Sequence, residues 1–185
     1  MHEENPWITT GSREIYDNPW INLTEFQVLN PAGKPGIYGK IHFKNLAIGV
    51  VAIDDADQIV LVGQYRFPID KYSWELPEGG GPLGTNPLDS AKRELLEETG
   101  LVAENWSEIL RMHLSNSVSD ELAIIYMAEN LTQHEAQPEE TEQLEIKKVP
   151  FEEAFEMVMK GEITDSMSVA AILKIKCLRG FAKEQ

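Results

Sequence analysis

The segment from Asn86 to Gly100 constrains the fold more than any other part of the sequence, because both of its ends carry helix signals. Asn86 is a favourable N-cap, Pro87 suits the first helical position, and Asp89 follows three residues after the cap. Gly100 suits the position just past a helix C-terminus. The sequence therefore predicts a helix over residues 87–99.

Short apolar, β-branched runs on both sides of this helix predict strands. The runs 46–54 and 58–67 flank the turn DDAD and are predicted to be interior strands of one hairpin. Residues 1–19 are polar and contain two similar stretches, ENPW at 4–7 and DNPW at 17–20, which are interpreted as two turns, each followed by an anchoring tryptophan. The other predicted strands are 20–29, 37–44, 107–114, 121–129 and 142–149.

Two further helices are predicted at the end of the chain, over residues 151–161 and from near Asp165 onward. Mixed strands, one internal helix, then strands and helices indicate an α/β sandwich with a mixed sheet between helices. With 185 residues, the chain fits one globular domain with a small appendage.

The charge balance is strongly acidic, with 31 acidic against 16 basic residues and a formal net charge of −15. This argues against binding to nucleic acid or to anionic membranes, because both reward a basic surface. The first residues lack a secretory signal pattern and no apolar run is long enough to span a membrane, so we expect a soluble, cytoplasmic protein. The single cysteine, Cys177, has no disulfide partner and is predicted to lie in the core.

The predicted helix carries three glutamates on about one turn, in a chain that is already acidic. At about 100° per residue, Glu94, Glu97 and Glu98 form a stripe beside apolar residues. Arg93 can form an i,i+4 ion pair with Glu97, which leaves Glu94 and Glu98 in need of a cation. The apolar stripe consists of Leu88, Ala91 and Leu95.

The segment WELPEGGGPLG, residues 74–84, comes just before this helix and is predicted to be a tight loop. Glycines allow close backbone approach to a ligand. Paired hard oxygen ligands next to such a loop suit Mg²⁺, which takes a few carboxylates, waters and phosphate oxygens. The alternative is a solvated acidic helix face without a ligand.

These residues resemble the signature of the Nudix hydrolases, which cleave nucleoside diphosphates linked to another moiety. Gly79 starts the signature, and its second half is complete in this chain. Thr85 departs from it, because the family has a glutamate there, and this puts in doubt one contact to the loop or to a metal-bound water. The second half consists of Arg93, Glu94, Leu95, Glu97, Glu98, Gly100 and Leu101.

The resemblance implies a Nudix α/β/α sandwich with a mixed sheet over residues 45–185, preceded by antiparallel strands within residues 1–44. It also implies that Glu94 and Glu98 bind Mg²⁺, with Mn²⁺ as a substitute, and that Glu97 orients Arg93 or contacts a second ion. Glu78, which replaces a usual alanine, is added to the candidate metal ligands.

The flanking stretch GQYRFPIDKYSWELPEG is similar to the branch that hydrolyses ADP-ribose and GDP-mannose. The function implied is Mg²⁺-dependent cleavage of a nucleoside diphosphate sugar to a nucleoside monophosphate and a sugar phosphate. This branch commonly dimerises through its N-terminal strands, so a homodimer is expected. The alternatives are a nucleotide-binding sensor with weak catalysis and a hydrolase of other nucleoside polyphosphates.

In this branch the general base often comes from a loop outside the signature, and the equivalent stretch here is QPEETEQLE. Glu140 is the first candidate and Glu142 the second, as base or as additional metal ligand. An acidic loop with no catalytic part is the alternative.

Candidate substrate contacts complete the predicted site. Arg66 can pair with two phosphate oxygens, although it can equally well pair with a carboxylate of the protein. Several aromatic residues can stack on a base, although aromatics in strands are more often core. Ser117 and Asp120 lie in a segment that the resemblance places over the substrate. The aromatic candidates are Trp20, Tyr65, Phe67 and Trp74.

Overall fold

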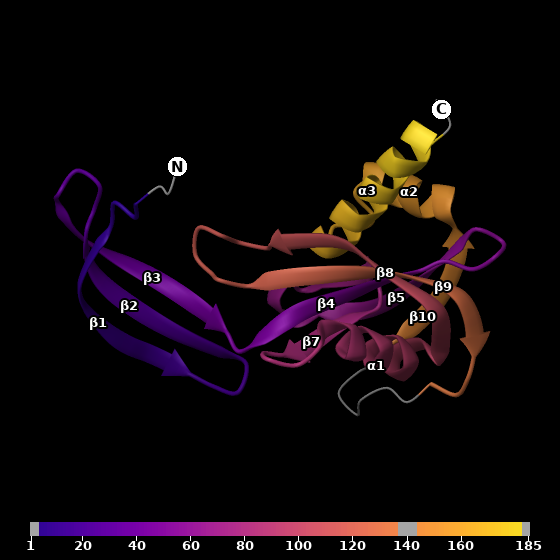
Figure 1. Ribbon diagram of the computed structural model, residues 1–185, viewed down its shortest axis with the longest axis horizontal. Helices are drawn as coiled ribbons and strands as arrows, with labels where there is room; N and C mark the ends of the chain where they lie inside the picture. Colours follow the sequence, from indigo (N-terminus) through magenta and orange to yellow (C-terminus); the bar gives the residue numbers. More distant parts are fainter. Residues whose placement is uncertain (1–3, 137–143, 183–185) are drawn as a thin grey trace. The chain divides into compact units, whose positions relative to one another are not determined.

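The computed structural model describes residues 4–136 and 144–182 (Figure 1). Its α/β architecture confirms the predicted fold class. The chain divides into two compact units. Unit 1 consists of Met1–Asn45 and His113–Leu122, and unit 2 of Leu46–Met112 and Ala123–Gln185.

Unit 1 is built around an antiparallel sheet in the order β1-β2-β3. Its strands follow one another along the chain and pair from end to end, with Ile21 opposite Phe43 and Leu29 opposite Pro35. The first strand lies between the two predicted turns and agrees with the antiparallel strands expected within residues 1–44: this polar stretch becomes a strand because the backbone of β2 offers it a partner. The three strands are β1 (Ile8–Asp17), β2 (Ile21–Leu29) and β3 (Pro35–Phe43).

Unit 2 contains two sheets, in the orders β10-β5-β6 and β7-β4-β9-β8. Three α-helices pack around them, and Figure 1 shows α1 on one side of the strands and α2 and α3 on the other. The strands are β4 (Asn45–Ala52), β5 (Gln58–Arg66), β6 (Lys71–Glu75), β7 (Glu78–Pro82), β8 (Leu101–His113), β9 (Leu122–Gln133) and β10 (Glu145–Pro150). The helices are α1 (Pro87–Thr99), α2 (Phe151–Met159) and α3 (Ser166–Ala182), and a 3-10 turn, η1, covers Phe67–Ile69.

The hydrophobic core of unit 2 lies where β4, β5 and β9 meet the helices. Ala91 and Leu95 of α1 are fully buried, so the predicted apolar stripe does face the core, although Leu88 is only half-buried. On the other side, Phe151 of α2 and Ile172 of α3 are buried. No α-helix among residues 4–136 and 144–182 has the length and apolar character needed to cross a bilayer.

The predicted hairpin of residues 46–54 and 58–67 is wrong in its pairing. The turn closes as expected, because the amide of Asp54 donates to the carbonyl of Gln58 and Ile53 bridges Ile59. Beyond that bridge the strands separate into different sheets, and β4 pairs in parallel with β9 instead. Apolar runs of this kind identify buried strands but not their partners.

Two other predictions are corrected. The glycines of the WELPEGGGPLG segment do not form a loop but the strand β7, which lies beside β4. Gly81 has a packing reason, since a Cβ there would come within 2.8 Å of Ile48. Cys177 is exposed on α3 rather than buried in the core, because this helix buries only one of its faces.

Candidate active site

Helix α1 positions the acidic stripe, and it has the bounds that its sequence signals predict. The Asn86 side chain accepts a hydrogen bond from the Leu88 amide, and Gly100 ends the helix with φ 71°. Two of the three glutamates are buried: Glu94 is 7% exposed and Glu98 is 2% exposed. The acidic stripe is therefore not a solvated surface, and the alternative of a bare helix face does not describe it.

Arg93 lies between the glutamates and β7. Its guanidinium donates to Glu97 Oε2 at 2.6 Å, which confirms the predicted i,i+4 pair. It also donates to the Gly80 carbonyl at 2.9 Å and to Glu94 Oε1 at 2.5 Å. The prediction that Glu94 lacks a protein cation is thus corrected, because Arg93 reaches it as well.

Strand β7 runs directly against the glutamates of α1. A Cβ built at Gly79 would lie 2.3 Å from the carboxyl carbon of Glu94, so no side chain fits at this position. The next residue back, Glu78, donates its amide to Glu98 Oε2 at 3.0 Å. The signature glycine therefore lets the β7 backbone and the buried carboxylates approach each other closely.

A second set of charges lies on the other side of Glu78. Arg66, at the end of β5, donates from Nε to Glu75 Oε2 at 2.9 Å and from Nη2 to Glu78 Oε1 at 2.9 Å. Glu75 is only 3% exposed, so these are not surface ion pairs. In this structure Arg66 pairs with protein carboxylates, which is the alternative that the sequence left open.

Glu78 is a carboxyl group whose surroundings disfavour its charged form. Burial raises its pKa well above the ordinary value, and the nearby carboxylates of Asp165 and Glu75 raise it further, while Arg66 lowers it. Its Oε2 atom is buried and has no hydrogen-bond partner among the described residues. Such an oxygen favours a bound cation or proton.

The N-terminus of α3 completes this region with residues that the sequence analysis missed. The Ser168 hydroxyl, which is fully buried, accepts the Leu76 amide at 2.9 Å. The Ser168 amide in turn donates to Asp165 Oδ2 at 2.7 Å, so Asp165 caps the helix. The sequence carries a signal for this cap, because an aspartate stands three residues before a serine at the predicted start of the helix.

The donor set fits a divalent cation in its chemistry. Glu94, Glu98 and Glu78 supply hard carboxylate oxygens, and the buried Oε2 of Glu78 has no hydrogen-bond partner among the described residues. In the described parts of the chain, no three His, Cys, Asp or Glu side chains are already gathered around one point as a metal site requires. These residues are therefore candidate ligands whose oxygens have to converge when an ion binds.

The aromatic candidates of unit 2 have different surroundings. Trp74 packs over Gly63, where a Cβ would come within 2.8 Å of the indole, and Lys147 Nζ lies 4.3 Å from the centre of its ring. Trp74 therefore already has protein neighbours that a stacking base would have to displace. Tyr65 and Phe67 are exposed, and the Tyr65 hydroxyl donates to Asp70 at 2.5 Å.

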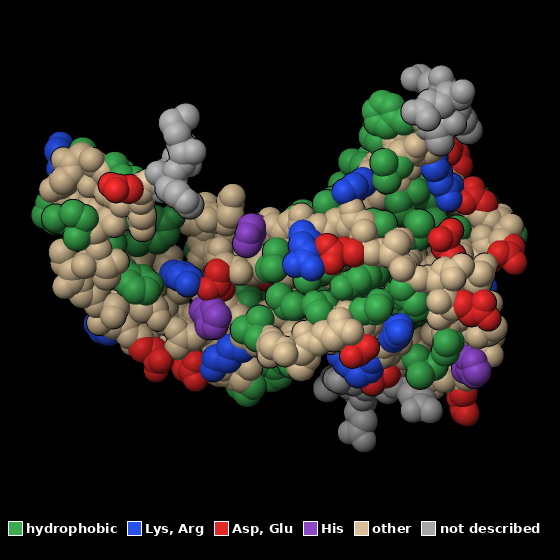
Figure 2. Space-filling model, in the orientation of Figure 1, with side chains coloured by type: hydrophobic (Ala, Val, Ile, Leu, Met, Phe, Trp, Pro, Cys, Tyr) green, Lys and Arg blue, Asp and Glu red, His purple; other side chains and the backbone are tan. Residues whose placement is uncertain are grey.

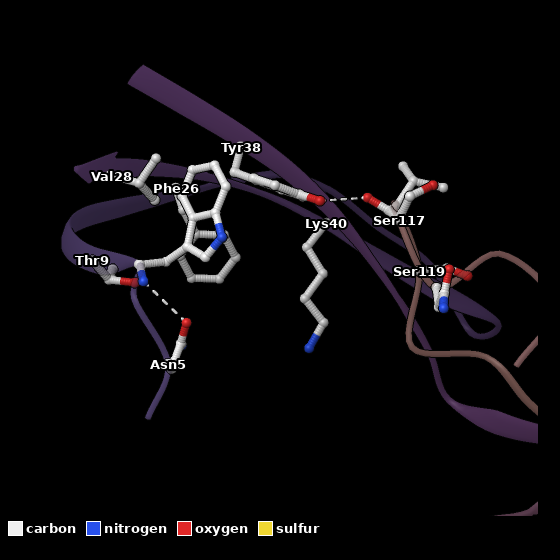
Figure 3. A pocket seen from close by; sticks show the side chains of 11 residues that line it. Asn5, Thr9, Phe26, Val28, Tyr38, Lys40, Ser117 and Ser119 are labelled. Atoms are coloured by element: carbon white, nitrogen blue, oxygen red, sulfur yellow. Dashed lines mark hydrogen bonds between the residues drawn. The ribbon is translucent and has the colours of Figure 1, made fainter. Parts of the chain in front are cut away.

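The remaining candidates, Trp20, Ser117 and Asp120, belong to unit 1. Trp20 is exposed. The Ser117 carbonyl accepts the Tyr38 hydroxyl at 2.6 Å, at the edge of a pocket lined by Phe26, Val28 and Lys40 among others (Figure 3).

Asp120 lies at the centre of a charged cluster in unit 1. It contacts Lys40 Nζ and His42 Nδ1, both at 2.8 Å, and accepts the Phe43 amide at 3.0 Å. Burial alone would raise its pKa, but the hydrogen bonds from Lys40 and His42 lower it to about 2. In this structure, therefore, Asp120 ties the 113–122 segment to β3.

Two predictions about the base fall where the structure gives no description. Glu140 and Glu142 lie in the segment 137–143, outside the described residues. Thr85, at the position that departs from the signature, is exposed, and its hydroxyl donates to the Pro82 carbonyl at 2.7 Å. It therefore serves the turn between β7 and α1.

Comparison with known protein families gives two matches that follow one another along the chain. A model of the NUDIX domain matches residues 43–168. A model of the nucleoside diphosphate sugar hydrolase N-terminal domain matches residues 5–41. The first match contains α1 and the carboxylates around it.

Individual proteins are similar over nearly the whole chain. An ADP-ribose pyrophosphatase of Mycobacterium tuberculosis is 32% identical, covering 97% of this chain and 88% of that protein. One of Bacillus subtilis is 31% identical, covering 89% of each. A crystal structure of an ADP compounds hydrolase superposes with a TM-score of 0.85 at 18% identity, over 97% of this chain and 98% of that one, which shows a shared fold.

Proposed function

Because the chain belongs to the Nudix family of hydrolases, we propose that it cleaves the pyrophosphate bond of a nucleoside diphosphate sugar. The favoured substrate is ADP-ribose, which would give AMP and ribose phosphate, with GDP-mannose as the other candidate. The names of the similar pyrophosphatases and the match of residues 5–41 support this choice. An enzyme for such nucleotides would work in the cytoplasm.

The observation that carries the proposal is the close approach of β7 to the buried glutamates of α1. Gly79 leaves no space for a side chain between the strand and Glu94, and the Glu78 amide is fixed on Glu98. This arrangement holds the buried carboxylates of Glu94 and Glu98 against the backbone of β7. Burying such charges costs free energy unless they are paired with an opposite charge or coordinate a metal ion.

We propose Mg²⁺, or Mn²⁺ in its place, as the cofactor, with Glu94 and Glu98 as its main ligands and Glu97 and Glu78 as further ones. When bound, the cation would offset the charge of the pyrophosphate and lower the pKa of a water. The protein's own part is to orient these carboxylates: Arg93 fixes Glu97 and Glu94, and Arg66 fixes Glu78. Glu140 or Glu142 is proposed to take the proton of the attacking water.

The test is hydrolysis of ADP-ribose with Mg²⁺, with EDTA, and with the Glu98→Gln variant. A metal ion supplies several kcal/mol of charge stabilisation in a transition state. We therefore expect kcat/KM to fall by roughly a hundredfold or more in the variant and with EDTA. Exposed Glu153 on α2 gives the matched control, because Glu153→Gln removes the same charge far from α1 along the chain. Full turnover by Glu98→Gln would overturn the metal assignment.

We also propose that the chain forms a homodimer through residues 1–44. Unit 1 exposes large apolar side chains, among them Ile8 on β1, Trp20 between β1 and β2, and Ile37 on β3, and Figure 2 shows hydrophobic side chains on the surface of this unit. Exposed large apolar side chains suit an interface between two copies of the chain.

A further inference from the structure

A polar cavity lies next to the buried carboxylates of unit 2. It has a volume of about 400 Å³, within the range of small-molecule sites. The ends of β5, β6 and β7 line it on one side, and the N-terminus of α3 lines it on the other. Its polar lining consists of Arg66, Ser73, Glu75, Glu78, Thr164, Asp165 and Ser166.

Glu78 connects this cavity to the glutamates of α1. Its backbone amide donates to Glu98 Oε2, and its side chain lines the cavity and accepts from Arg66. A substrate with its pyrophosphate at the α1 carboxylates would therefore have one of its two ends beside this cavity.

The charges of the cavity do not suit an anion. Among the described residues that line it, Arg66 is the one cationic side chain, and its guanidinium is already held by Glu75 and Glu78. Asp165 adds a third carboxyl group from α3. A negatively charged group placed here would meet an excess of carboxylates in a partly buried site, where repulsion is strong.

The same lining suits hydroxyl groups. Carboxylates accept up to about four hydrogen bonds each, and Glu75 and Asp165 bring carboxylates to the lining of the cavity. Ser73, Thr164 and Ser166 bring hydroxyls to the same cavity. An uncharged sugar can donate to the carboxylates and exchange hydrogen bonds with these hydroxyls.

Resting on the proposed function, we infer that this cavity takes the sugar attached to the distal phosphate, and that Glu75 and Asp165 select an uncharged, hydroxyl-bearing group over an anionic one. The enzyme then rejects substrates with a further phosphate or carboxylate at that end. This is selection by an unfavourable charge as well as by favourable contacts.

The inference is tested with two substrates that differ in one group: ADP-ribose, and ADP-ribose with a phosphate on the anomeric hydroxyl of its terminal ribose. The measured quantity is the ratio of their kcat/KM values, determined by product chromatography with Mg²⁺. For the wild-type enzyme we expect roughly a hundredfold preference for ADP-ribose, the effect of bringing a doubly charged group to like charges in a site of intermediate dielectric constant.

The diagnostic variant is Asp165→Asn, because asparagine also caps a helix and can still accept the Ser168 amide. We expect it to narrow the preference by about tenfold, through loss of one repelling charge. The matched control is Asp55→Asn, which removes the same charge in the exposed turn before β5. It is expected to leave the ratio unchanged. Melting temperatures of both variants show whether the fold is intact.

The outcomes separate this inference from the proposed function. Hydrolysis of neither compound by the wild type would overturn both. Cleavage of ADP-ribose together with equal cleavage of the phosphorylated compound would overturn only the charge selection. Equal ratios for Asp165→Asn and Asp55→Asn would show that Asp165 only caps α3, and would remove it from the selecting set.

Discussion

Each of the two units of this protein is stabilised internally by a different kind of interaction. In unit 2, central residues of β4, β5 and β9 are fully buried, and the helices cover them. In unit 1, Val28 is the one buried hydrophobic residue among those that the structure describes, and the sheet depends on backbone pairing and polar contacts. A three-stranded sheet with so little core gains little from burial. Unit 2 therefore depends on a hydrophobic core, whereas unit 1 depends on backbone pairing and polar contacts.

Shortening a core side chain in each unit would test this contrast with the largest expected effect. Leu61→Ala, in the centre of β5, should lower the free energy of unfolding by about 3 kcal/mol, because it leaves a cavity in a packed core. Val28→Ala should cost about 1 kcal/mol, because fewer neighbours surround the lost methyl groups. Urea unfolding followed by far-ultraviolet circular dichroism measures both. Equal losses would contradict the contrast.

Replacing one exposed apolar residue in each unit with glutamate tests which unit forms the proposed dimer interface. Ile37 is 71% exposed on β3. If unit 1 forms the dimer, Ile37→Glu should raise the dimer dissociation constant by about a hundredfold, because a carboxylate would be buried at the interface. Leu178→Glu on α3 is the matched change in unit 2 and should leave the constant unchanged. Sedimentation equilibrium measures it, and a wild-type monomer would end the dimer proposal.

The polar contacts of Asp120 in unit 1 should make the stability of the protein depend on pH. This is the smallest of the three effects predicted for the two units. The pKa of Asp120 is about 2 in the folded protein and 3.8 ordinarily. Its ionised form therefore stabilises the fold fully above about pH 4, and this contribution is lost as the pH falls towards 2. Because the side chain is one-third exposed, screening reduces the contribution to about 1 kcal/mol.

Comparing the wild type with Asp120→Asn measures the contribution of ionised Asp120 to the free energy of unfolding. The difference in unfolding free energy between wild type and variant should be constant down to about pH 5, should be roughly halved at about pH 3, and should have mostly disappeared by about pH 2. An undiminished difference at about pH 2 would mean that Asp120 acts by shape or neutral hydrogen bonding rather than by charge.

Sequence patterns predicted the local features well, because their causes are local. Asn86, Pro87 and Gly100 bound α1 through contacts within a few residues, and Arg93 reaches Glu97 across one helical turn. The same stretch predicted an acidic ligand face, and Glu94 and Glu98 are buried, while their binding of a metal stays a prediction. Such features depend only on neighbours in the chain.

Features that depend on distant partners were not predictable in this way. The glycines of β7 form a strand because β4 lies beside them, and β4 leaves its predicted hairpin because β9 pairs with it. Arg66 pairs with carboxylates because the fold brings Glu75 and Glu78 to its guanidinium, and Asp165 joins the cavity only through the packing of α3. No spacing along the sequence carries this information.

The parallel pairing of β4 with β9 sets an order of events during synthesis. Ala52 of β4 pairs with Ala128, so this sheet cannot be completed until residue 128 has left the ribosome. Unit 1's strands β1, β2 and β3 are adjacent in the chain and can pair as soon as they emerge. The glutamates of α1 are translated before the strand that completes the sheet behind them. For that interval the nascent chain carries α1 without the completed sheet, and the carboxylates proposed as metal ligands reach their final surroundings only after about thirty more residues have been added.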